Sequence, residues 1–293
     1  MSIEPCVRSD GAARVETAVR GAGVPVLVLH GSPGGIDAAM VMSRFLPEDR
    51  FRTVLVSRPG YLGTALDPEH ASIDDEADLL AGVLDDLGIE RVGVLAWSGG
   101  GPVAYRLAVR HPDRVSAVVA ASAVSGRWVP GRTGPVEYLV SHTAIGARLA
   151  GWAARHLPHA AVGGAITGVS SLHGRSLRRH VQGILGDTER RAFMLDMAAT
   201  GNSSGAHRAG WRNDVRTFGA IESLELDRIG APVLVVHGDA DTEVVVSHSV
   251  RAAQQIPGAE LVLLSGGTHF AFWSHREATD VQARAQEFLA ASL

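Results

Sequence analysis

The sequence of 293 residues predicts an α/β fold: a mostly parallel central sheet flanked by helices, with a helical lid inserted late in the chain. Short β-branched runs alternate with stretches of helical spacing, as βαβ units do. The runs are apolar throughout, as expected of parallel strands that helices cover on both faces. The alternation stops between residues 127 and 220 and then resumes, which indicates an insertion.

The elements of the core follow in order along the chain. Strands are predicted at 13–19, 24–29, 51–56, 92–97, 115–124, 232–236 and 260–264, and helices at 36–46, 73–87, 102–110, 243–256 and 274–290. Apolar residues such as Ala77, Leu80 and Leu84 recur at helical spacing in the second of these helices, and Gly88 ends it. Residues 1–126 and 221–293 form the expected core domain.

The inserted segment, 127–220, shows helical periodicity and many glycines, and predicts a lid domain. Helices are expected at 136–157, 176–185, 188–200 and 206–218. The segment holds 12 arginines and 5 acidic residues, although the whole chain has net charge −4. This positive charge either docks the lid on an acidic body or attracts anionic substrates. Glycines at 163–168 and 201–205 suggest a mobile lid.

Composition excludes several classes of protein. The hydrophobic and charged fractions, 46% and 20%, are those of an ordinary globular domain. The single cysteine, Cys6, lies in a tail-like N-terminus and excludes an internal disulfide framework. No apolar run approaches the roughly 18 residues of a membrane helix. The first residues lack the basic start and apolar core of a signal peptide, so a cytoplasmic protein without membrane attachment is expected.

Ser98 is the first candidate for chemistry. It ends an apolar run, Val92 to Trp97, and Gly99, Gly100 and Gly101 follow it. Small neighbours allow a strand to turn sharply into a helix, which leaves the serine above the sheet edge. The plainer alternative is a serine in a tight turn. As a nucleophile, Ser98 needs a base to take its proton.

The base and the acid are expected on loops that follow the last two strands. His269 follows the last strand, and Asp241 follows the strand before it. A carboxylate that orients the imidazole is needed to fix its tautomer. Asp239 is the rival carboxylate, but it is better placed to cap the following turn.

An oxyanion hole is expected from the backbone N–H groups of Gly99 and Ser32, the latter in the glycine-rich loop 30–35. A phosphate cradle is the alternative for that loop, but the Gly-x-Gly-x-x-Gly and Gly-Lys-Ser/Thr spacings are absent. The sequence contains neither paired cysteines nor a His-Glu-x-x-His spacing, so it predicts no metal site. The arginine pairs 178–179 and 190–191 lack the interleaved aromatics of a nucleic-acid surface. No cofactor is expected.

Together these motifs resemble the α/β-hydrolase fold family. Ser98, Asp241 and His269 match its nucleophile, acid and base in chain order, and 57–63 resembles its Asp-x-Pro-Gly-x-Gly stretch. The resemblance covers about two thirds of the chain, all but the lid. Ala96 and Thr268 stand where glycine is usual, and Ser57 replaces the usual aspartate, which weakens transfer of any one subfamily.

The resemblance implies a lidded serine hydrolase that cleaves a carboxylic ester, a small molecule with an apolar acyl part, through an acyl-enzyme; the chain length of the substrate stays open. A peptide or amide hydrolase similar to proline iminopeptidase is less favoured, because acids are expected in its lid. A carbon–carbon bond hydrolase and a cofactor-free haloperoxidase or perhydrolase use the same triad and stay open. A ligand-binding protein on this fold is the non-enzyme alternative. Dehalogenases and epoxide hydrolases need an aspartate at the position of Ser98.

Aromatic residues are the candidates for substrate binding. Trp97 beside the nucleophile, Phe270 beside the base and Trp128 at the start of the lid are predicted to contact substrate. Packing under the turn is the alternative for Trp97. Further candidates in the lid, which equally suit its own core, are Tyr138, Trp152, Phe193, Met194 and Met197. The oligomeric state stays open.

Overall fold

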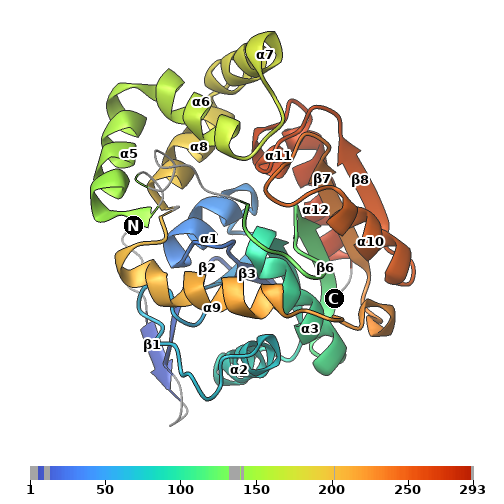
Figure 1. Ribbon diagram of the computed structural model, residues 1–293. Helices are drawn as coiled ribbons and strands as arrows, with labels where there is room; N and C mark the ends of the chain where they lie inside the picture. The colour runs from blue at the N-terminus through green and yellow to red at the C-terminus, as the bar shows by residue number, and fades with distance from the viewer. Residues whose placement is uncertain (1–5, 10–13, 132–138, 140–141, 201, 292–293) are drawn as a thin grey trace.

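The computed structural model describes residues 6–9, 14–131, 139, 142–200 and 202–291. Figure 1 shows a central sheet with helices on both faces and, at one end, helices of the inserted segment 127–220, which keeps the name of the predicted lid. The predicted fold class is therefore confirmed. Within the described residues, no helix is both long and apolar enough to cross a bilayer.

The sheet of the described residues has eight strands in the order β1-β2-β4-β3-β5-β6-β7-β8. The strands are β1 (Cys6–Ser9), β2 (Arg14–Arg20), β3 (Val24–Leu29), β4 (Phe51–Val56), β5 (Val92–Trp97), β6 (Val115–Ala121), β7 (Val233–Gly238) and β8 (Glu260–Leu264). β1 and β2 pair antiparallel, and all strands from β4 to β8 are parallel. The chain runs outward in opposite directions from β3 and β5, which makes their junction the switch point of the sheet.

Two apolar clusters hold helices on the two faces. One contains buried residues of α2 (Ile73–Asp86), α3 (Gly101–Arg110) and α10 (Ser247–Gln255). The other contains α1 (Ile36–Met42), α11 (Ala271–Ser274) and α12 (Ala278–Ala290). A capping box of Ser72 and Asp75 starts α2, because each side chain satisfies a free backbone N–H of the other.

The lid helices, all but the first, divide between the same two clusters. They are α5 (Ala144–His156), α6 (Pro158–Gly168), α7 (Gly174–Leu185), α8 (Thr188–Thr200) and α9 (Arg208–Gly219). Buried residues of α6, α7 and α8 join the cluster of α1 and α12, whereas Phe218 of α9 joins that of α2 and α3. In Figure 1, α9 accordingly runs across the core toward α3, apart from the group α5–α8.

Several boundaries differ from the sequence prediction. Cys6 lies in β1, an edge strand rather than a tail. The helix expected at 136–157 is described only as α5, since 136–138 and 140–141 lie outside the described residues, as does Ala13 of the predicted first strand. The helix α6 was missed, because its glycines and scattered apolar residues hide helical periodicity.

At the end of the chain, the helix expected at 274–290 is two helices, α11 and α12. His275 separates them, and its Nε2 lies 3.2 Å from the carbonyl oxygen of Ser265. The helix expected at 243–256 begins only at Ser247, because residues 243 and 244 donate their N–H groups to Asp241.

Candidate active site

The predicted site residues all follow carboxyl ends of parallel strands. The glycine-rich loop follows β3, Ser98 follows β5, Asp241 follows β7 and His269 follows β8. β3 and β5 are neighbours at the switch point, where open α/β sheets form a ligand crevice. The topology therefore places the nucleophile candidate beside the candidate oxyanion loop.

Ser98 has a backbone φ of +53°, a left-handed conformation that is costly for a residue with a side chain. The turn is held by its surroundings, because the carbonyl of Ser98 accepts the N–H of Val124 and α3 begins three residues later. Such a strained corner between strand and helix is the geometry of a nucleophile elbow.

The oxyanion loop lies against the residue after the nucleophile. A Cβ placed on Gly99 would lie only 2.1 Å from Ser32 Oγ and 3.1 Å from the backbone nitrogen of Ser32. On the other side of the loop, a Cβ on Gly31 would lie 3.1 Å from Ser98 Cβ. Only glycine fits at these two positions, and the two predicted oxyanion donors therefore adjoin each other near Ser98.

Asp241 and His269 are joined as predicted for acid and base. His269 Nδ1 lies 2.7 Å from Asp241 Oδ2, and both side chains are buried. A carboxylate can only accept, so Nδ1 carries the proton and Nε2 is the basic nitrogen. Within the described residues, no hydrogen bond joins Ser98 Oγ to His269. A hydrogen bond between a nucleophile and its base is often long without substrate and tightens only when substrate binds.

Charge attraction decides the protonation of this pair. Burial alone raises the pKa of Asp241, but attraction to His269 and hydrogen bonds from His237 and His269 hold it well below its ordinary value. Burial lowers the pKa of His269, but the charge and hydrogen bond of Asp241 outweigh it and raise the pKa above its ordinary value. The pair is thus an ionised carboxylate beside a strengthened base.

The rival carboxylate, Asp239, has another partner. Its Oδ1 accepts the backbone N–H of Gly266 at 2.6 Å, which ties the β7 loop to the loop after β8. It thus supports the loop that carries His269 rather than the imidazole itself.

His237, at the end of β7, is a neighbour of Asp241 that sequence reasoning missed. Its Nε2 lies 2.8 Å from the carbonyl of Val244 and 3.2 Å from Asp241 Oδ2, and Nδ1 lies 2.6 Å from Ser249 Oγ. The available signal was a histidine at the end of an otherwise apolar strand, four residues before Asp241.

Trp97 and Phe270 form an aromatic wall beside the base. The ring of Trp97 lies 5.1 Å from that of His269 and 5.4 Å from that of Phe270, between centroids. The indole N–H of Trp97 donates to the carbonyl of His269 at 3.1 Å. Trp97 therefore holds the loop of the base, whatever its contact with substrate.

The other predicted liners lie elsewhere in the lid. Trp128 packs against Trp211 and Phe218 and donates its indole N–H to the carbonyl of Glu243. Its role in substrate binding stays a prediction. Of the remaining candidates, Phe193, Met194 and Met197 are buried on α8, Trp152 is 49% exposed on α5, and Tyr138 lies outside the described residues.

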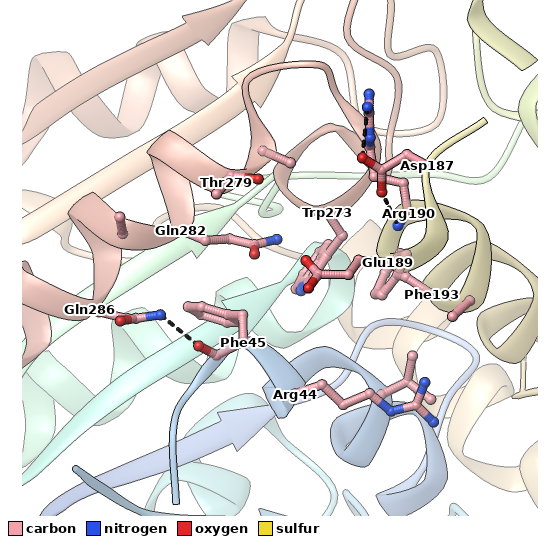
Figure 2. A pocket seen from close by; sticks show the side chains of 14 residues that line it. Arg44, Phe45, Asp187, Glu189, Arg190, Phe193, Trp273, Thr279, Gln282 and Gln286 are labelled. Atoms are coloured by element: carbon pink, nitrogen blue, oxygen red, sulfur yellow. Dashed lines mark hydrogen bonds and ion pairs between the residues drawn. The ribbon is translucent and has the colours of Figure 1, made fainter. Parts of the chain in front are cut away.

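A cavity of about 470 Å³ lies between α8, α12 and the segment that holds α1 (Figure 2). Phe45, Phe193 and Trp273 give it aromatic walls, and Glu189 and Gln282 add polar groups. None of Ser98, Asp241 and His269 lines it. The Trp273 ring, stacked on Phe193 at 5.0 Å, lies between this cavity and Trp97. Among the described residues, no group of His, Cys, Asp and Glu could hold a metal ion.

Comparison with known proteins supports this assignment of the fold. A family model described as the alpha/beta hydrolase fold matches residues 24–276. The solved structure of an alpha/beta hydrolase fold protein from Nakamurella multipartita is 44% identical, has a TM-score of 0.94 and is matched over 99% of each chain. The uncharacterized hydrolase YcgS of Bacillus subtilis is 26% identical over 269 residues, 91% of each chain.

Relatives with a named activity that match most of the chain, such as a hydrolase from Cupriavidus pinatubonensis at 28% identity, are more distant than the Nakamurella protein. The esterase RhEst1 from Rhodococcus is 21% identical over 100% of each chain with a TM-score of 0.66, a likeness that carries the fold alone. Across its relatives, this fold is found in esterases, carbon–carbon bond hydrolases and haloperoxidases. What these proteins share is the fold, and their named reactions differ.

Proposed function

The chain belongs to the α/β-hydrolase fold family, and we propose that within it the protein is a serine hydrolase that cleaves a carboxylic ester. The observation that carries the proposal is the buried pair of Asp241 and His269, which leaves Nε2 as the base, together with a strained serine that directly follows Trp97, the residue whose indole N–H donates to the carbonyl of His269. A serine that ends a strand at positive φ, with an oriented imidazole nearby, suits nucleophilic attack on an acyl group.

The proposed reaction has two halves. Ser98 Oγ attacks the carbonyl carbon while His269 Nε2 takes the hydroxyl proton, and the carbonyl oxygen becomes an oxyanion. The N–H groups of Ser32 and Gly99 hold that oxyanion. His269 then gives the proton to the departing alcohol. Water attacks the acyl-enzyme after losing a proton to the same nitrogen, and the carboxylic acid leaves as Ser98 regains its proton.

Apolar groups around the proposed nucleophile favour an ester with an apolar acyl part. The rings of Trp97 and Phe270 stand beside His269, and neither brings a charge to the acyl group. We therefore assign these two residues to the acyl pocket. An ester is favoured over the other acyl compounds on family analogy, since esters are the substrates most often met on this fold.

The test is labelling with a fluorophosphonate probe, together with hydrolysis of p-nitrophenyl acetate, butyrate and decanoate. We expect the wild-type protein to be labelled and to hydrolyse at least one ester, and Ser98→Ala to lose both. Ser122→Ala is the matched control, because Ser122 also follows a parallel strand and also has a positive φ, +45°. A folded wild-type protein that is neither labelled nor active would contradict the proposal. Labelling without ester turnover would redirect it to amides or carbon–carbon bonds.

A further inference from the structure

A buried group of polar side chains joins the lid to the oxyanion loop. We call it the Arg58 cluster, and it consists of Ser32, Arg58, Tyr61, Glu76 and Asp214. Arg58 is 1% exposed and Asp214 is 2% exposed. Four of its members belong to the core, and Asp214 comes from α9 of the lid. Charges this deeply buried are costly unless every polar atom is paired, so their arrangement is specific.

The carboxylate of Asp214 receives four hydrogen bonds. Arg58 Nη2 donates to Oδ1 at 2.9 Å, and Arg58 Nη1 donates to Oδ2 at 3.1 Å, which is the paired geometry that arginine favours. The hydroxyl groups of Tyr61, at 2.6 Å, and of Ser32 also donate to Oδ2. Burial, followed by the charge of Asp214, raises the pKa of Tyr61 well above its ordinary value, so its hydroxyl stays a donor.

Arg58 keeps a second counter-ion on the core side. Its Nε donates to Glu76 Oε1 at 2.7 Å and its Nη2 to Glu76 Oε2 at 3.2 Å. The backbone N–H of Arg58 donates to His30 Nε2, and His30 Nδ1 in turn lies 2.7 Å from the carbonyl of Gly31. Arg58 is therefore tied to the oxyanion loop through its main chain as well as its side chain.

Ser32 is where the cluster meets the proposed chemistry. Its hydroxyl donates to Asp214 and accepts from Arg58 Nη1 at 3.2 Å, while its backbone N–H is a proposed oxyanion donor. The same hydroxyl lies within 2.1 Å of where a Cβ on Gly99 would stand. A small rotation of Ser32 would thus move its N–H relative to that of Gly99, and oxyanion donors act only when pre-positioned.

We infer that Asp214 and Arg58 are positioning residues that set the oxyanion loop from the lid through the hydroxyl of Ser32. The inference rests on the proposed function, because it assigns Ser32 its oxyanion role. Neither residue touches the reacting atoms in this account. Their effect reaches the reaction only through the hydroxyl of Ser32. Removing the carboxylate of Asp214 and removing the hydroxyl of Ser32 should therefore cause the same loss of kcat, and the two losses should not add.

The test is a double-mutant cycle of Asp214→Asn and Ser32→Ala, read as kcat and KM for the best p-nitrophenyl ester. Ser32→Ala keeps the backbone donor and removes only the hydroxyl link. Loss of one oxyanion donor costs roughly 10²–10³-fold in kcat, so we expect each single variant to lose about tenfold or more, with little change in KM. The double variant should lose no more than the worse single variant. Arg58 retains Glu76 in both variants, which keeps the buried guanidinium paired.

The matched control is Asp196→Asn, which removes another ion pair between lid and core, that of Arg44 with Asp196, at the exposed edge of α8. It should leave kcat unchanged. The inference is overturned if the fold-losses in kcat of Asp214→Asn and Ser32→Ala multiply in the double variant. It is also overturned if Asp214→Asn changes only KM and thermal stability. The proposed function stands in both cases. A wild-type protein without Ser98-dependent turnover would overturn both.

Discussion

Asp241 and Asp239 lie two positions apart in one loop but serve different partners. Asp241 accepts from His269, whereas Asp239 accepts from the backbone of Gly266. Asp241→Asn should lower kcat by on the order of 10⁴-fold, because the negative charge is lost and the amide NH2, which would face His269 Nδ1 once the amide oxygen accepts from residues 243 and 244, favours the wrong tautomer. Asp239→Asn should cost less than about tenfold, because an amide oxygen can still accept from a backbone N–H. Steady-state kinetics on both variants test this, and equal losses would contradict it.

Titration of His269 governs the predicted pH dependence. The base acts only when neutral, so kcat/KM should fall as the pH drops through the pKa of His269. Burial lowers this pKa, but the charge and hydrogen bond of Asp241 raise it by more than burial lowers it. The midpoint should therefore lie above the ordinary histidine value of about 6.5. In Asp241→Asn the attraction is lost while burial remains, and the midpoint should move below that of the wild type.

A pH profile of kcat/KM for the wild type, Asp241→Asn and Asp239→Asn measures these midpoints. Asp239→Asn is the control, since Asp239 contacts the loop rather than the ring. A wild-type midpoint below 6.5, or one that Asp241→Asn leaves in place, would mean that another group titrates.

At this scale, sequence reasoning reached the residues whose position in the chain defines their role. Ser98 after β5 and His269 after β8 could be placed by the order of strands alone. Arg58 and Asp214 could not, because 156 positions separate them and only the folded chain joins them. His237 was missed for the same reason, as its contacts depend on how the loop after β7 folds back.

At the scale of elements, α9 approaches the core closely at Gly210. A Cβ on Gly210 would lie 2.3 Å from the ring of Tyr61, and the backbone N–H of Gly210 donates to the carbonyl of Gly60. Gly210→Ala should therefore destabilise the protein by about 1–3 kcal/mol, as overpacking does, despite the better helix propensity of alanine. The shift of the denaturation midpoint in urea measures the effect.

Gly183→Ala, in α7, is the control for this prediction. A Cβ there has no atom within 4 Å, so the change should stabilise the protein by up to about 1 kcal/mol through helix propensity. Equal effects of the two substitutions would show that the approach of α9 does not limit stability.

Element boundaries were predictable where one periodicity ran unbroken. The strands β2 to β8 and the helix α8 were predicted within a few residues of their ends, because their apolar pattern is continuous. The error at the last helix had a tertiary cause, since His275 separates α11 from α12 through a contact with Ser265. Pairing with β2 makes β1 a strand, and the four residues of β1 carry no pattern by themselves.

Across the whole molecule, the lid is attached to the core by α8, by α9 and by the segment between α6 and α7, where the carbonyl of Val169 accepts the N–H of Thr242. α8 contacts the core through the stack of Phe193 on Trp273 and the ion pair of Asp196, and α9 contacts it through the Arg58 cluster. α5 packs on α6 and α8, and exposes Ile145, Leu149 and Trp152 by about half or more. The mobility that the glycines suggested should therefore be confined to part of the lid.

Hydrogen–deuterium exchange followed by mass spectrometry tests this division. Amides of α5 to α7 should exchange well before those of the sheet, because few buried apolar side chains hold them. Amides of α9 should be protected nearly as long as the amides of β5 and β6, which serve as internal controls. Uniform protection of all five lid helices would refute a mobile lid, and rapid exchange in α9 would refute its anchoring.

The ionic attachment of α9 has a consequence for warmed protein. The cost of keeping charges away from water falls as temperature rises, whereas the gain from burying apolar area levels off. The attachments through α8 and α9 should therefore fail in order, the aromatic contact of α8 first and the charged contact of α9 later. Heated protein would expose the apolar face that α8 buries against the core, while Ser32 still kept its hydrogen bonds to Arg58 and Asp214. Aggregation of molecules whose active site is still intact, rather than loss of the active-site geometry, would then set the upper working temperature.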